Sequence, residues 1–281
     1  MTSSDAVVAV RRLLPKGVRV GHGGTLDPDA AGVLPIGLGA ATRLFDSLAD
    51  HPKEYVAELR LGVATDTRDA SGVVTSRGAV SAGEREIHEA IRGFVGEIDQ
   101  VPPIHSALRS GGKRYYEIAR GGVAFEPAPR RVRIDSIDYL GGSGARHRVA
   151  VRCGKGAYIR SLCHDIGQAL GCGGHMGTLI RSRSCGFGIG DGVTLESLRA
   201  LAEAGRFESA LIPPDRPLDH LQTLRIGEES RKRTLDGAPF DAPDVTGDGP
   251  FRVYCAGSFL GLGIRAGEGT VRMKLVLADR T

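Results

Sequence analysis

The stretch GHGGTLDPDAAGVLPIGLG, residues 21–39, is the feature that most limits how this chain can fold. It holds six glycines and two prolines. Glycine has no side chain to restrict its backbone and proline lacks an N–H donor, so neither a helix nor a central strand can run through the whole stretch. The sequence therefore predicts a loop whose backbone can approach a ligand closely, with His22 and Asp27 as its reactive side chains.

Composition places the chain among globular proteins. It has 281 residues, of which 41% are apolar and 25% charged, enough for one large domain or a main domain plus a small one. No run approaches the roughly 20 apolar residues of a membrane helix, and the N-terminus lacks the apolar segment of a secretory signal. We therefore expect a cytoplasmic protein with no membrane partner. Five cysteines without a C-x-x-C pair indicate reduced, packed thiols.

Positive charge is concentrated in the middle of the chain. The whole sequence has a net charge of +4, yet residues 101–190 hold fourteen Lys and Arg against five Asp and Glu, a local balance of +9. Twelve of those fourteen are arginines, whose planar fork suits phosphate oxygens. The pattern favours a polyanionic partner. A solvated basic face without a ligand is the alternative that charge alone leaves open.

Periodicity and turn residues predict an α+β fold. Helical spacing is found in four segments: 3–15, 81–96, 158–171 and 194–205. Strand-like alternation is found in three: 55–62, 130–140 and 147–153. The second helix is expected to begin with a capping box from Ser81 to Glu84. Prolines indicate a linker over 206–222, and the short strands and glycine turns beyond it predict a small all-β domain.

Several common chemistries lack their motifs here. The sequence has no G-x-x-x-x-G-K-[ST] phosphate loop and no G-x-S-x-G elbow, and GLGIRA at 261–266 has no helix after it to bind a dinucleotide. Cys163, His164, Cys172 and His175 are too irregularly spaced for a zinc site. Asp27 is thus the main candidate for chemistry, although an Asp-Pro pair taken alone is usually part of a turn.

The glycine-rich stretch also resembles a family signature. GHGGTLDPDAAGVLPIGLGAATR matches the pattern G-H-x-G-T-L-D-P-x-A-x-G-V-L-P of the TruB family of tRNA pseudouridine-55 synthases. Three more blocks are similar to that family: KEYVAELRLGVATDTRDASG, QVPPIHSALRSGGKRYYEIARGG and CGKGAYIRSLCHDIGQALGCGGHMGTLIRSRSCGFG. The resemblance implies a catalytic domain, residues 1–220, with a mixed, mainly antiparallel sheet flanked by helices. A small PUA-like RNA-binding domain, residues 221–281, would follow.

This resemblance implies an isomerase that converts uridine 55 in the T loop of tRNA to pseudouridine. Uracil is detached from its ribose at N1 and rejoined through C5. Because the reaction is an isomerisation, no cofactor and no metal are expected. The implied partner is tRNA, and we expect the enzyme to be a monomer.

Three catalytic residues follow from the resemblance. Asp27 corresponds to the carboxylate that acts on the nucleotide, through either the base or the sugar. A closed pocket disfavours its charged form, and Arg160 corresponds to the arginine that holds it ionised through a charge-assisted pair. Tyr55 corresponds to the tyrosine that stacks on the flipped uridine and serves as a base in the sugar proton transfer. Without the motifs, Tyr55 would be an ordinary core residue and Arg160 a surface residue.

Five further residues are expected to bind the substrate by the same resemblance. His22 would fill the stack that the flipped base leaves, Tyr158 and Leu179 would line the pocket, and Lys155 and Arg181 would contact phosphates. The segment 107–122 is expected to clasp the RNA backbone through Arg109, Lys113, Arg114, Tyr115 and Tyr116.

The chain departs from the family pattern at two places. Gly23 stands where the family commonly has threonine, which is expected to loosen the loop. The family's usual N-terminal strand and Lys-Pro-x-Gly element are also missing before MTSS, so we expect reduced stability. One alternative is an RNA-binding or tRNA-folding protein that has lost catalysis through this truncation. Another is a relative that acts on other RNAs within a guide complex.

Overall fold

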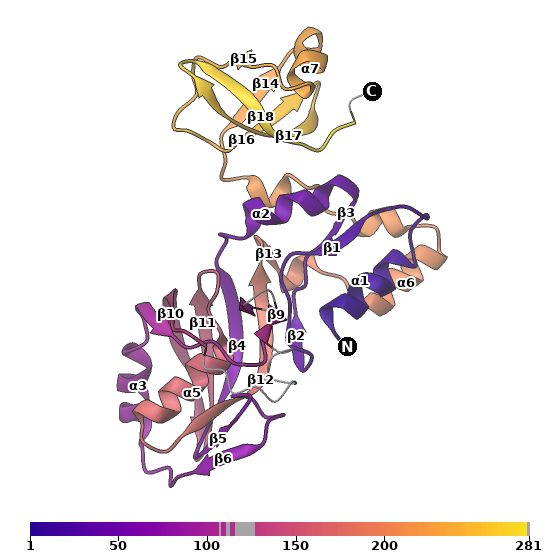
Figure 1. Cartoon of the computed structure of the whole chain (residues 1–281). Coiled ribbons are helices and arrows are strands. Elements are labelled where there is room, and N and C mark those ends of the chain that lie inside the picture. Colours follow the sequence, from indigo (N-terminus) through magenta and orange to yellow (C-terminus); the bar gives the residue numbers. More distant parts are fainter. Residues whose placement is uncertain (107, 111–112, 116–126, 280–281) are drawn as a thin grey trace.

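The computed structural model describes residues 1–106, 108–110, 113–115 and 127–279. In Figure 1 a large domain of mixed helices and strands lies below a small C-terminal domain rich in β-structure. The α+β class predicted from the sequence is confirmed. No helix among the described residues is both long enough and apolar enough to cross a membrane.

A seven-stranded sheet of order β13-β12-β4-β11-β10-β7, with β2 beside β12, forms the centre of the large domain. Its strands are β2 (Ala30–Gly32), β4 (Lys53–Leu61), β7 (Gly96–Gln100), β10 (Arg130–Ser143), β11 (Arg146–Cys153), β12 (Gly174–Ser184) and β13 (Phe187–Gly188). Only the pair of β2 and β12 is parallel. The sheet is therefore mixed and mainly antiparallel, as expected.

Alternation along β4 explains why one face of the sheet is buried. Every second residue from Tyr55 to Leu61 is buried, and those between are partly exposed, because successive side chains of a strand point to opposite faces. Helices α3 (Glu84–Arg92) and α5 (Ile159–Ala169) cover the apolar face (Figure 1). Their buried apolar residues complete the main core: Ile87, Ile91, Ile159, Leu162 and Ile166.

The capping box predicted for α3 is wrong in its residues. The helix begins at Glu84, and the N–H of Gly83 donates to the carboxylate of Glu86. A carboxylate three residues after the N-cap accepts from the N–H of the N-cap residue, which is Gly83 here and would have been Ser81 in the predicted box. Two further helices of the large domain, α1 (Ser3–Arg11) and α6 (Leu195–Glu203), pack side by side (Figure 1).

The glycine-rich stretch is a loop braced by short strands. β1 (Val20–His22) pairs antiparallel with β3 (Ile36–Leu38), while β2 joins the main sheet. A 3-10 turn, η1 (Gly39–Leu44), and the short helix α2 (Phe45–Leu48) follow. The loop between β1 and β2 therefore lies against the end of the main sheet.

Several short elements complete the large domain. The strand pairs are β5 (Val63–Thr65) with β6 (Val74–Arg77), and β8 (Arg109–Ser110) with β9 (Lys113–Arg114). The further 3-10 turns are η2 (Ile189–Asp191), η3 (Phe207–Ala210) and η4 (Arg216–Leu218).

The C-terminal domain is a five-stranded sheet of order β14-β16-β17-β18-β15. The strands are β14 (Thr223–Ile226), β15 (Phe240–Asp241), β16 (Phe251–Cys255), β17 (Ser258–Gly267) and β18 (Thr270–Val276). It has its own apolar core, which includes Phe251, Val253 and Val271. One helix, α7 (Glu228–Leu235), adds to the all-β arrangement expected from the sequence. Its strongly polar sequence, EESRKRTL, hid the helix because only its last turn is buried.

A third apolar cluster joins the two domains, and we call it the junction cluster. Its buried members are Leu44, Leu48, Cys185, Leu218 and Leu262. Leu262 lies on β17 of the small domain. The others belong to the large domain, with Leu44 on η1, Leu48 on α2, Cys185 between β12 and β13, and Leu218 on η4. The predicted linker, 206–222, is therefore partly core, because η4 buries Pro217 and Leu218.

Candidate active site

The loop between β1 and β2 brings Asp27 to the first turn of α5, where Arg160 lies. Nη2 of Arg160 donates a hydrogen bond to Oδ1 of Asp27 at 3.0 Å, and Nε lies 2.9 Å from Oδ2. The Arg160 side chain is 6% exposed and that of Asp27 34%. A two-point contact of this kind fixes the plane of a carboxylate as well as its charge. The arginine thus orients a carboxylate that solvent and ligand can still reach.

Arg160 is held from a second side. Its Nη2 also donates to the carbonyl of His105 at 3.1 Å, and its Nη1 lies 3.7 Å from Oδ2 of Asp69. Asp69 is fixed in turn, because Thr67 and Ser71 donate hydrogen bonds to its Oδ1. One buried guanidinium therefore lies between two carboxylates.

Arg68 ties the turn that carries Asp69 to α5. Its φ of 63° is in the left-handed region, which is uncommon for a residue with a side chain. Nη1 of Arg68 donates to the carbonyl of Val101 at 2.6 Å and to Oγ of Ser161 at 2.7 Å. Sequence reasoning missed Arg68 and Asp69. They stand in the family-like block KEYVAELRLGVATDTRDASG, but the polar run DTRDAS after a strand is also typical of an ordinary turn.

Burial sets the electrostatics of the site. It raises the pKa of Asp27 above the ordinary value of 3.8, Arg160 opposes this effect, and the negative charge of Asp69 adds to it. Desolvation disfavours a charged carboxylate whatever its partners. Asp27 is thus a better base than an exposed aspartate, and Arg160 limits how far its pKa rises.

Tyr55 lies on β4 beside these groups, with Arg181 as its cross-strand partner on β12. The side chain is buried, which raises the pKa of the phenol to about 12. The hydroxyl therefore stays protonated at neutral pH in the free protein. A role as a base requires the phenolate, which this environment disfavours, whereas a stacking role requires no change of protonation.

Tyr158 and Leu179 lie near the pair from two directions. Tyr158 is the N-cap residue of α5, and its backbone is fixed by both side-chain polar atoms of Gln100, at 2.8 and 3.1 Å. Leu179 is buried on β12 opposite Ala30 of β2. The structure therefore brings both residues to the loop of Asp27, and both also serve as packing residues.

His22 ends β1 at the entrance of the loop. It is partly buried, and its Nδ1 accepts a hydrogen bond from the N–H of Gly24 at 3.3 Å. Burial and the nearby charge of Arg181 lower the pKa of the imidazole. A ring that is neutral at pH 7 is suited to stacking rather than to binding phosphate.

Two predicted phosphate contacts have different surroundings from those expected. Arg181 is only 1% exposed, and its donors are directed at backbone carbonyls, so the prediction of a phosphate contact is wrong for this residue. Lys155 is exposed, as a phosphate contact requires, and forms a 2.6 Å ion pair with Asp50. Exposed pairs of this kind contribute little to stability, because water screens the two charges and both side chains lose freedom. Asp50 therefore competes for Lys155 only weakly, and its phosphate contact stays a prediction.

Part of the predicted RNA clasp lies outside the described residues. The structure describes the paired strands β8 and β9. Of the predicted segment, residues 107, 111–112 and 116–122, with Tyr116, are beyond its description. The role of the segment 107–122 therefore stays a prediction.

Gly23 has a structural reason in this chain. A Cβ atom there would lie 2.6 Å from two ring carbons of Phe45 and 3.0 Å from Sγ of Cys185. The ring of Phe45 fills the space that a side chain at position 23 would need. Phe45 therefore packs against the loop at Gly23, and the expected loosening of the loop stays a prediction.

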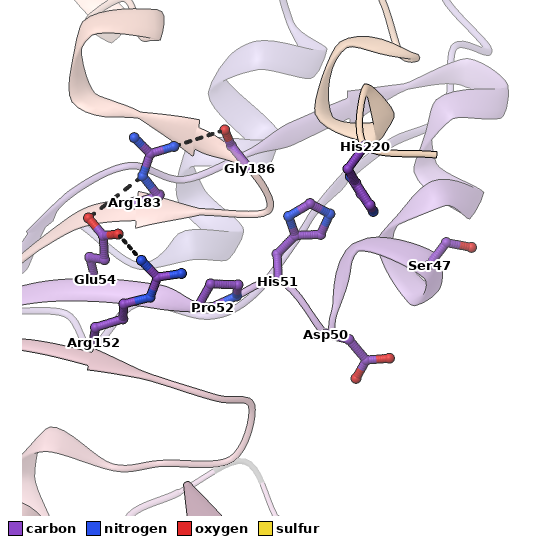
Figure 2. Close-up of a pocket in the computed structure, with 9 residues that line it drawn as sticks. All are labelled: Ser47, Asp50, His51, Pro52, Glu54, Arg152, Arg183, Gly186 and His220. Atoms are coloured by element: carbon purple, nitrogen blue, oxygen red, sulfur yellow. Dashed lines mark hydrogen bonds and ion pairs between the residues drawn. The ribbon is translucent and has the colours of Figure 1, made fainter. Parts of the chain in front are cut away.

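A cavity of about 550 Å³ lies away from Asp27, near the domain junction. Its lining residues are Ser47, Asp50, His51, Pro52, Glu54, Arg152, Arg183, Gly186 and His220. Figure 2 shows Glu54 between Arg152 and Arg183, and the rings of His51 and His220 are 5.1 Å apart. Although Glu54 precedes Tyr55, strand alternation directs it to the opposite face of the sheet. None of the predicted site residues lines this cavity.

Metal-ligating side chains are scattered. Over the described ranges, no group of three or more His, Cys, Asp or Glu side chains could hold a metal ion. The five cysteines are free and buried.

Comparison with known proteins identifies the fold and the family. Residues 11–159 match the TruB family pseudouridylate synthase N-terminal domain, and residues 160–221 match the tRNA pseudouridylate synthase B C-terminal domain. A chain in the crystal structure of a Cbf5-Nop10-Gar1 complex superposes with a TM-score of 0.76 at 27% identity. That match covers 100% of this chain and 82% of the other.

Curated relatives match over most of their length. The tRNA pseudouridine synthase B of Heliobacterium modesticaldum is 51% identical over 81% of this chain and 74% of its own. That of Azoarcus sp. is 40% identical over 100% of this chain and 92% of its own. By sequence and by structure, this chain belongs to the TruB family of pseudouridylate synthases.

Proposed function

We propose that this tRNA pseudouridine synthase isomerises uridine 55 in the T loop of tRNA, with Asp27 as its catalytic carboxylate. The observation that carries the proposal is the contact of Asp27 with Arg160 beside Tyr55. It unites three residues from distant motifs at one accessible point. The relatives named tRNA pseudouridine synthase B support tRNA as the substrate.

The reaction breaks the bond from uracil N1 to ribose C1′ and forms a bond from C5 to C1′. The proton leaves C5 and N1 gains one, so atoms and charge balance without a co-reactant. Asp27 can act as nucleophile at C1′ or at the uracil ring, and both routes need its ionised form. Because Arg160 stabilises that form and fixes its plane, the pair supplies an oriented anion within a partly dry pocket.

The target base must leave the RNA stack before Asp27 can reach it. Flipping costs a few kcal/mol, and stacking on an aromatic ring returns about 1–3 kcal/mol per base. We assign this stacking to Tyr55, with Tyr158 and Leu179 as the walls. The neutral ring of His22 takes the place of the flipped base in the T loop.

Binding of the rest of the tRNA is assigned to the segment 107–122 and to the C-terminal domain. We place the domain boundary at 220/221, with residues 221–281 as a PUA-like RNA-binding domain and Lys155 as a phosphate contact. The enzyme is expected to act as a cytoplasmic monomer without a metal.

An RNA-binding protein without catalysis is the weaker alternative. Such a protein does not need a buried charged pair in its RNA site, because removing two ions from water costs free energy that binding alone does not require. Asp27 and Arg160 nevertheless remain within hydrogen-bonding distance. This geometry favours the enzyme.

The test is to incubate the protein with unmodified tRNA and to measure pseudouridine at each position. The parent should modify position 55, and a tRNA with cytidine there should yield no product. Asp27→Asn should bind tRNA and give no detectable product, whereas Asp46→Asn, at an exposed position on α2, should behave as the parent. Tight binding without product from the parent would support the alternative, and product from Asp27→Asn would remove Asp27 from the mechanism.

A further inference from the structure

The side chain of Arg181 is fully buried, although it carries a charge. It is 1% exposed, and it heads the large side chains that the fold removes from solvent. Nε donates to the carbonyl of Val33 at 2.9 Å, Nη1 to that of Thr25 at 3.1 Å and Nη2 to that of Gly24 at 3.1 Å. Its donors thus point at the backbone of the catalytic loop, and the side chain is closed off from solvent.

These acceptors lie on both sides of Asp27 in the sequence. Gly24 and Thr25 precede it, and Val33 follows it, so one guanidinium fastens the two ends of the segment whose middle is Asp27. The backbone of Arg181 joins the same arrangement, because its carbonyl accepts from the N–H of Val33 at 2.8 Å. Both the side chain and the main chain of a single residue therefore hold the loop.

Gly32 shows how closely the loop approaches Arg181. Its φ is +108°, and a Cβ atom there would lie 2.2 Å from the carbonyl oxygen of Arg181. Only glycine permits this contact. The loop is therefore shaped to lie directly on β12 at Arg181.

We propose that Arg181 is the positioning residue of the catalytic loop, which sets Asp27 against Arg160. The inference rests on the proposed function and adds a residue that touches neither the base nor a phosphate. An arginine is required because its planar fork presents donors in several fixed directions at once, whereas lysine offers a point charge on a flexible stem. Loss of the fork leaves the loop free to shift, and a displacement of about 1 Å at a catalytic group can cost about 100-fold in rate.

The surroundings of Arg181 provide a readout that does not depend on activity. Its charge lies close enough to His22 to lower the pKa of that imidazole, in addition to the effect of burial. Its removal should raise the pKa of His22, which NMR can follow on the ring protons. An Arg181 side chain that did not lie against this loop would leave that titration unchanged.

The experiment compares Arg181→Lys and Arg181→Met with Arg183→Met, a matched change two residues along the same strand. The control side chain is 47% exposed and lies outside the active site. Three quantities are measured for each protein: the single-turnover rate at saturating enzyme, the Kd for tRNA at several salt concentrations, and the thermal unfolding midpoint. Arg181→Lys keeps the buried charge, so it preserves a test if Arg181→Met does not fold.

We expect Arg181→Lys to lower the single-turnover rate by about 100-fold, with Kd and its salt dependence close to those of the parent. Arg183→Met should keep the parent rate. A weaker Kd, a salt slope smaller by about one and an unchanged rate would restore the phosphate contact and overturn the proposal. A lower unfolding midpoint with an unchanged rate for the folded protein would reduce Arg181 to a stabilising residue and also overturn it.

The outcomes separate this inference from the proposed function. A parent that forms no pseudouridine contradicts the function, and the His22 titration then decides the inference alone. In that case, a raised pKa of His22 in Arg181→Met but not in Arg183→Met supports the placement of Arg181 on the loop. An unmoved pKa overturns it.

Discussion

Asp27 and Arg160 are 133 positions apart in the chain, yet two nitrogens of the arginine lie within 3.0 Å of the two carboxylate oxygens. The contact needs the loop after β1 and the first turn of α5 to be placed together. The reactive carboxylate is oriented only when both segments are in that position.

Arg160→Lys should lower the single-turnover rate by about 100-fold, because lysine can reach one carboxylate oxygen but cannot hold the plane of both. The rate is measured on unmodified tRNA at saturating enzyme. Arg148→Lys, an exposed change on β11, is the control and should keep the parent rate. Equal rates for parent and Arg160→Lys would show that the two-point contact has no catalytic role.

The rate should depend on pH through Asp27. The ionised form is active, so the rate rises as the pH passes the pKa of Asp27, which burial holds above 3.8. Asp69→Asn removes a negative charge that raises this pKa, so the acidic limb should move to lower pH. The plateau rate should also fall, since Arg160 loses a partner. A pH–rate profile of single turnovers checks both effects, and a limb displaced to higher pH contradicts the assignment.

Gly23 and Phe45 should be coupled in stability. Gly23→Ala forces a methyl group against the ring of Phe45 and should cost about 1–3 kcal/mol of unfolding free energy. Phe45→Ala should remove most of that cost in the double variant, so the cycle should show a coupling of at least about 1 kcal/mol. Denaturant unfolding measures it. Gly190→Ala, with open space around the position, is the control, and additive effects would refute the contact.

Asp165 should make stability dependent on pH. Burial raises its pKa in the folded protein to about 6 from 3.8, so the folded state holds its proton to higher pH than the unfolded state. Stability is then lost as the pH rises from about 4 to about 6, and the loss is complete at pH 7. Asp165→Asn should therefore stabilise the protein at pH 7 by about 1–2 kcal/mol, a figure reduced for partial solvent exposure.

The gain from Asp165→Asn should disappear near pH 3.5, where the native carboxyl is also neutral. Urea unfolding at the two pH values provides the comparison. Asp138→Asn, on an exposed part of β10, should change stability by less than about 0.5 kcal/mol at either pH. A gain of equal size at both pH values would exclude titration as its cause.

The sequence predicts the fold class and the central pair well, because both depend on patterns that survive in a single chain. Alternation in β4 and helical spacing in α5 define the sheet and its cover. The motif around Asp27 and the run YIR before Ser161 mark the two members of the pair. These features are local, so they can be identified without coordinates.

Arg181 illustrates what could not be predicted. β12 contains two register shifts, one between Met176 and Leu179 and one between Arg181 and Arg183. Each shift interrupts the alternation that reveals which face of a strand is buried. The sequence pattern of such a strand therefore predicts an exposed arginine that could contact phosphate. Only the three-dimensional structure shows the backbone carbonyls that surround its side chain. Asp69 was missed for a related reason, since its partner Arg160 is close only in space.

The junction cluster has a practical consequence for anyone who wishes to produce the catalytic half alone. A fragment ending at residue 220 would lack Leu262, and the apolar side chains of Leu44, Leu48 and Leu218 would become exposed to solvent. Such a patch invites self-association. Since Phe45 of α2 packs against Gly23 in the loop that carries Asp27, loss of these contacts would also disturb the reaction centre, so the C-terminal domain shields the apolar end of the half that performs the chemistry.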